Sequence, residues 1–84
     1  PTPAAYTTLK GKRMKIYATR LGDRYYAQTE NGTITGFTND GICVAADTTE
    51  IILTEIAIEG KKRCLVKDYL NGVDKKELLG EVLK

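Results

Sequence analysis

The chain has 84 residues, of which 42% are hydrophobic and 29% charged, and its formal net charge is +2, which together describe one small globular domain. No apolar run approaches the roughly 20 residues that span a bilayer, and no signal-peptide pattern opens the chain, so a membrane protein is not expected. The sequence contains no histidine, so the commonest general base and the commonest zinc ligand are both missing, and a free-standing enzyme is the least favoured class.

The N-terminal part predicts two strands separated by a turn. Residues 6–9 are β-prone, and Lys10-Gly11 is typical of a turn. Residues 13–21 alternate with period two, as in a half-buried strand. One face would carry Met14, Ile16 and Ala18, and the other Arg13, Lys15, Tyr17 and Thr19. The second face combines two cations with an aromatic ring and could follow a nucleic-acid backbone.

The middle of the chain predicts a loop and then three strands. Residues 22–31 are polar and indicate a loop. Residues 32–38 form a strand weakened by Gly36, and Asn39-Asp40-Gly41 is a strong tight-turn signal before a strand at 42–46. After a turn at 47–49, residues 50–58 make the longest apolar strand. Both of its faces are apolar, which predicts a bend or bulge near Thr54-Glu55.

The C-terminal part predicts one short helix and an apolar tail. Val66, Tyr69 and Leu70 have helical spacing, Gly72 fits the position just after the helix, and Leu65 supplies no capping side chain. The tail after Lys76 would pack either on this domain or on another one. Five or six strands with one short helix predict a mainly β fold, a small closed barrel. Its core should include Ile16, Val44, Leu53 and Leu70.

The charges are segregated along the chain. Residues 1–24 carry a net +5, residues 25–59 a net −6 without any lysine or arginine, residues 60–67 a net +4, and residues 68–84 a net −1. A folded barrel could bring the two basic segments onto one face, which would attract a polyanion such as RNA. Lysines and arginines that merely solvate a strand are the alternative.

Several short motifs occur in a characteristic order. They are Gly32-Thr33-Ile34, Gly41-Ile42-Cys43-Val44, the basic turn Gly60-Lys61-Lys62-Arg63, Leu70-Asn71-Gly72, and the closing Gly80 and Leu83. In this order and spacing, the chain resembles the C-terminal domain of the methionyl-tRNA formyltransferase family from about Tyr6 to Leu83. It departs from the family pattern at Leu65, where a capping residue is usual, and at Ala57, where glutamine is frequent.

The resemblance implies an OB-like barrel over residues 6–84, preceded by a linker remnant at residues 1–5. It implies a cytoplasmic, non-catalytic, tRNA-binding domain of a translation-initiation enzyme. A separate N-terminal domain would transfer the formyl group from 10-formyltetrahydrofolate to initiator methionyl-tRNA. The basic turn matches the family motif, so Lys61, Lys62 and Arg63 are the first candidates for RNA contact. Arg13 and Lys15 are added from local charge and alternation alone.

Two other functions remain open at this point. The chain could be a structural or interaction domain of another formyltransferase, such as one acting on a nucleotide-linked amino sugar. It could also be a free-standing nucleic-acid-binding barrel, which would stack bases on exposed aromatic rings. No catalytic residue, metal site or cofactor is expected in this chain, and Cys43 and Cys64 are expected to be reduced thiols.

Overall fold

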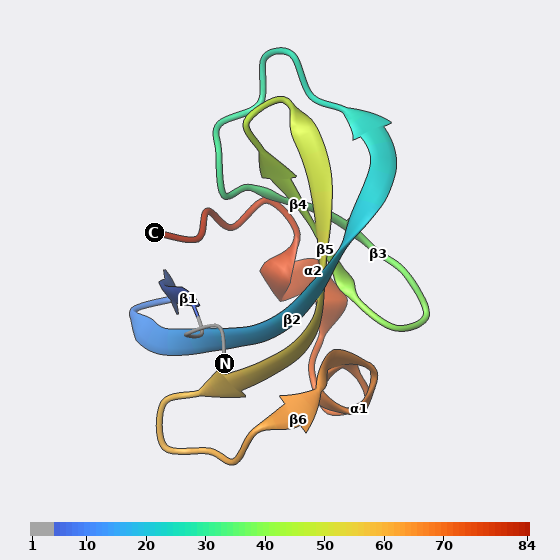
Figure 1. The fold of residues 1–84 in the computed structure, drawn as a ribbon. Helices are drawn as coiled ribbons and strands as arrows, with labels where there is room; N and C mark the ends of the chain where they lie inside the picture. The colour runs from blue at the N-terminus through green and yellow to red at the C-terminus, as the bar shows by residue number, and fades with distance from the viewer. Residues whose placement is uncertain (1–4) are drawn as a thin grey trace.

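Six strands form one antiparallel sheet in the computed structural model, which describes residues 5–84 (Figure 1). The strands are β1 (Ala5–Leu9), β2 (Lys12–Tyr25), β3 (Ile34–Phe37), β4 (Ile42–Ala46), β5 (Thr49–Ile58) and β6 (Cys64–Leu65). Their order is β1-β2-β5-β4-β3, and β6 pairs with β5. Helix α1 (Val66–Leu70) lies where it was predicted, and a second short helix, α2 (Lys75–Leu78), follows it. The mainly β prediction is confirmed.

The sheet curls into a barrel that strand pairing leaves open. Within residues 5–84, no pairing joins β1 to β3, the two ends of the sheet. The C-terminal segment lies in the gap instead: the Leu83 amide donates to the Gly32 carbonyl at 2.8 Å, and the Lys84 amide to the Thr8 carbonyl at 3.3 Å. Figure 1 shows this segment beside β1 and β4. The apolar tail therefore packs on this domain: its backbone bridges the two ends of the sheet, and Leu83 packs against the core.

A bulge in each of β2 and β5 changes which side chains of these strands face the core. Pairing runs from Ile16↔Ile56 to Ala18↔Glu55 to Thr19↔Leu53, which leaves Tyr17 and Thr54 as the extra residues. The bend predicted near Thr54-Glu55 is confirmed. Because an extra residue reverses the alternation, the apolar side chains of β5 that join or pack on one core are Ile51, Leu53, Ile56 and Ile58. For the same reason Thr19 lies on the face of Ile16, where Ala18 was expected.

Strand β2 is longer than the alternation indicated. The predicted loop at 22–31 is wrong for residues 22–25, which continue β2 as far as the Tyr25↔Thr49 pair. Glu50 holds this end in place: its carboxylate accepts from the Asp23 amide at 3.2 Å and from the Tyr26 hydroxyl at 3.0 Å, and the residue is 6% exposed. This polar segment can belong to the sheet because the buried Glu50 carboxylate accepts hydrogen bonds from its polar donors.

The core and the helix end agree with most of the predictions. Val44, Leu53 and Leu70 are buried, and Ile16 packs against the same cluster. Residue 72 follows the helix end as predicted, but its φ is not in the left-handed region; α1 ends instead with the amides of Asn71 and Gly72 donating to Asp68 and Tyr69. Both cysteines are free. Residues 1–4 of the expected linker lie outside the described part, and Ala5 already belongs to β1.

Candidate nucleic-acid interface

Two turns that are distant in sequence lie side by side at one end of the barrel. The β1–β2 turn contains Lys10 and Gly11, and the β5–β6 turn contains residues 60–63. Strand pairing joins them, because Met14 pairs with Ile58 and the Glu59 amide donates to the Arg13 carbonyl at 2.8 Å. The Arg13 amide in turn donates to the Glu59 carboxylate at 3.1 Å. Both basic segments of the sequence therefore meet at this end.

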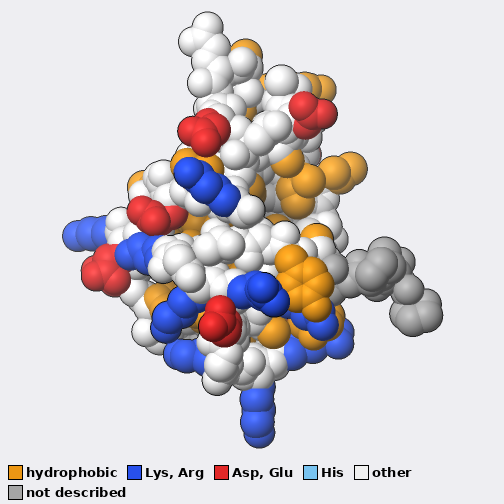
Figure 2. Space-filling model, turned by 90° about the vertical axis from the view of Figure 1, so that its left-hand side faces the viewer, with side chains coloured by type: hydrophobic (Ala, Val, Ile, Leu, Met, Phe, Trp, Pro, Cys, Tyr) orange, Lys and Arg blue, Asp and Glu red, His pale blue; other side chains and the backbone are white. Residues whose placement is uncertain are grey.

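A shallow groove of about 250 Å³ lies between these segments, and we call it the basic groove. Its lining is Tyr6, Arg13, Lys15, Ala57, Ile58, Glu59, Gly60 and Lys61. Three cations thus face a single acid, and that acid already accepts a hydrogen bond from a backbone amide. Figure 2 shows lysine and arginine side chains gathered over the lower part of this side of the molecule. Such a concave basic surface attracts anions.

Aromatic rings hold two of the cations. The Lys15 Nζ lies 5.3 Å from the ring centre of Tyr6 and 5.4 Å from that of Tyr17. The Arg63 guanidinium lies 4.0 Å from the Tyr17 ring centre, within the range of a cation–π contact. The neighbouring tyrosine hydroxyls, first that of Tyr6, hold the pKa of Lys15 above its usual value. Lys15 therefore stays protonated at neutral pH.

Arg63 is partly neutralised by an acid. Its Nε donates to the Glu55 carboxylate at 2.5 Å. This hydrogen bond lowers the pKa of Glu55 and raises that of Arg63. Glu55 itself pairs with Leu65 in the β5–β6 ladder, which brings the two charges together. Arg63 has less free charge to offer a ligand than Lys61 or Lys62.

The predicted site residues converge, although unequally. Arg13, Lys15 and Lys61 line the basic groove, and Arg63 joins Lys15 through the Tyr17 ring. Lys62 lies between Lys61 and Arg63 in the β5–β6 turn; it is exposed but does not line the groove. The RNA-contact residues predicted from the sequence did not include Lys10 and Lys12. These two lysines line an adjacent depression together with Lys61. Both lysines contribute to the net charge of +5 of residues 1–24, so the charge pattern could have identified them.

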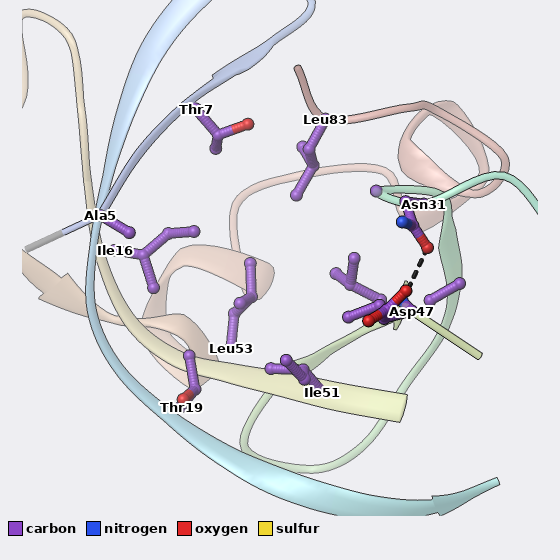
Figure 3. Close-up of a pocket in the computed structure, with 13 residues that line it drawn as sticks. Ala5, Thr7, Ile16, Thr19, Asn31, Asp47, Ile51, Leu53 and Leu83 are labelled. Atoms are coloured by element: carbon purple, nitrogen blue, oxygen red, sulfur yellow. Dashed lines mark hydrogen bonds between the residues drawn. The ribbon is translucent and has the colours of Figure 1, made fainter. Parts of the chain in front are cut away.

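A larger cavity of about 410 Å³ opens in the gap of the barrel (Figure 3). Figure 3 shows Ile16, Ile51, Leu53 and Leu83 around it, and the Asp47 amide donates to the Asn31 side-chain oxygen at 2.6 Å. Among the described residues that line it, Asp47 is the one titratable side chain, so no acid–base pair of residues 5–84 converges there. Over residues 5–84 no group of three or more potential metal ligands occurs. No helix in that part is long and apolar enough to cross a membrane.

Comparisons with known proteins agree with the order of the sequence motifs. The family described as "Formyl transferase, C-terminal domain" matches residues 1–74. The chain is 39% identical over 82 residues to the methionyl-tRNA formyltransferase of Streptococcus thermophilus, covering 98% of the chain and 25% of that protein. It is 39% identical over 85 residues to the methionyl-tRNA formyltransferase of Bacillus subtilis, covering 95% of the chain and 26% of that protein.

A third relative, the methionyl-tRNA formyltransferase of Bacillus velezensis, is 38% identical over 86 residues, which cover 96% of the chain and 26% of the relative. The chain thus spans about a quarter of the length of the curated relatives it matches. The family match covers most of the chain, including all six strands and the whole of α1. The chain belongs to the formyl transferase C-terminal domain family.

Proposed function

We propose that this chain is the tRNA-binding, non-catalytic domain of a methionyl-tRNA formyltransferase. The observation that carries the proposal is the convergence of Arg13, Lys15 and Lys61 on one groove, beside Lys62. The names of the relatives supply the kind of RNA. In the whole protein, a separate N-terminal domain would use 10-formyltetrahydrofolate to formylate initiator methionyl-tRNA in the cytoplasm, and this domain would hold the tRNA in position.

The expected binding mode is electrostatic. Lysine and arginine side chains contact phosphates, which position the RNA without reading its sequence. Each contact releases condensed counterions, so the logarithm of the affinity falls with the logarithm of the salt concentration by roughly 0.7–0.9 per contact. We expect about three to five contacts from an isolated domain with this cluster of cations. The binding should therefore be weak and should depend strongly on salt.

Two charge-reversal pairs test the proposal. The double variant Lys61→Glu, Lys62→Glu should weaken binding of tRNA and reduce the salt slope. The matched control is Lys75→Glu, Lys76→Glu, which makes the same change in net charge on α2, where Lys75 lies over the Phe37 ring at 5.8 Å. The control should have a much smaller effect. Affinity would be measured across a salt series, with circular dichroism to confirm folding.

The outcomes separate the proposal from its alternatives. Equal losses from both pairs would show that net charge alone attracts the RNA and that no defined surface exists. No binding of tRNA by the parent at low salt would favour a structural or interaction domain of another formyltransferase. A formyl-transfer assay with the isolated chain should read background, because the chain contains no histidine, the commonest general base.

A further inference from the structure

Tyr6 is an exposed aromatic ring at the rim of a basic groove. Its side chain lies on β1 directly across from Lys15, with which it pairs in the strand register. The residue is 62% exposed, although burial of an aromatic ring is normally favourable. Lys15 contributes a cation–π contact to the ring at 5.3 Å, which restrains the ring's orientation. An exposed, restrained ring is available for stacking.

The basic groove has the composition of a nucleotide site. Tyr6, Ala57 and Ile58 offer an aromatic ring and aliphatic surface, and Arg13 and Lys61 offer positive charge in the same lining. A nucleotide likewise combines a flat base with a charged phosphate. The volume of about 250 Å³ is smaller than the roughly 300–1,000 Å³ of a typical small-molecule site. This size suits one unit of a polymer that continues across the surface better than a complete free ligand.

We propose that the basic groove takes one unpaired nucleotide of the RNA, with its base stacked on Tyr6 and its flanking phosphate held by Arg13 and Lys61. This inference rests on the proposed function and specifies the RNA structure that the domain recognises. The nucleotide must be unpaired, because the faces of a base inside a duplex are covered by its neighbours. Glu59 lines the same groove, and its carboxylate already accepts a hydrogen bond from the Arg13 amide, so the phosphate would be held by the two cationic side chains and not by that amide.

Substitution of Tyr6 separates stacking from charge. Tyr6→Ala should weaken binding of a fluorescently labelled single-stranded oligoadenylate by roughly 5- to 150-fold, which corresponds to the stacking of one base. The salt slope should not change, because no charge is removed. Tyr6→Phe keeps the ring and should bind like the parent. Tyr25→Ala is the matched control: Tyr25 is 80% exposed at the far end of β2 and should have no effect.

An RNA duplex of the same length is the second probe. Binding of the duplex should be the same for Tyr6→Ala and the parent. The inference would be overturned if Tyr6→Ala lost affinity equally for the single strand and for the duplex. It would also be overturned if Tyr6→Ala bound the single strand as tightly as Tyr25→Ala does. In either case a loss of binding in the Lys61→Glu, Lys62→Glu variant would leave the proposed function intact. Absence of RNA binding by the parent would reject both. Circular dichroism would confirm that each variant is folded.

Discussion

The same substitution at two glycines of the β3–β4 hairpin should change the free energy of unfolding in opposite directions. Gly41 is buried immediately before β4, and a Cβ atom there would lie 2.4 Å from Cγ2 of Ile52 and 2.7 Å from the Leu53 carbonyl oxygen. Carbon atoms in favourable contact are about 3.5–4.0 Å apart, so a separation about 1 Å larger is needed. Gly36 in β3 has no heavy atom within 4 Å of the corresponding position, and its φ is not in the left-handed region.

The size of each change in the free energy of unfolding depends on whether the neighbouring strands can move to make room for the added methyl group. Leu53 belongs to the β4–β5 ladder and Ile52 is 3% exposed, so relief of the Gly41 clash must shift one strand against the other. Overpacking of this kind typically costs about 1–3 kcal/mol. Gly36→Ala should instead stabilise the protein by about 0.4–1 kcal/mol, because alanine restricts the unfolded chain. For a domain of this size, each 1 kcal/mol shifts the Tm by roughly 4–8 °C.

Urea and thermal denaturation followed by circular dichroism would measure both variants. We expect Gly41→Ala to unfold at a lower urea concentration than the parent and Gly36→Ala at a higher one. Equal destabilisation by the two substitutions would refute the reasoning, because it would mean that the loss of glycine itself, rather than the approach of β5 to Gly41, determines the effect. An unchanged m-value would confirm that stability alone has changed.

Two further substitutions test the core and a surface ion pair. Leu53→Ala, at a residue that is 3% exposed, should cost about 2–5 kcal/mol in urea denaturation, and a cost below about 1 kcal/mol would contradict its place in the core. The Arg20 guanidinium, and next the Thr38 hydroxyl, lower the pKa of Asp40 from 3.8 to about 2. Since the folded-state pKa is the lower one, this contribution is present above pH 3.8 and is lost as the pH falls towards 2. Asp40→Asn should therefore lower the Tm at pH 6 far more than at pH 2, and a Tm difference at pH 2 as large as that at pH 6 would exclude this carboxylate as its cause.

Local patterns in the sequence were sufficient to predict most of the individual elements. Helix α1 occupies the predicted residues because its apolar spacing involves near neighbours only. The strand at 42–46 and the tight turn before it were predicted for the same reason. The basic turn and the family motifs were also visible without a structure, because they consist of consecutive residues. The double-sided apolar pattern of residues 50–58 even indicated a bulge near Thr54.

How these elements combine depends instead on contacts between residues that are distant in sequence. Tyr17 is an extra residue because β2 must match the bulge opposite it in β5, and this pairing brings Thr19 to the face of Ile16. Residues 22–25 continue the strand because Tyr25 pairs with Thr49 and because Glu50, which is distant in sequence, accepts a hydrogen bond from the Asp23 amide. The Met14↔Ile58 register likewise places Lys61 beside Lys15. Register and closure depend on packing between distant residues, so neither the open barrel nor the Tyr6 rim of the basic groove could be derived from local patterns.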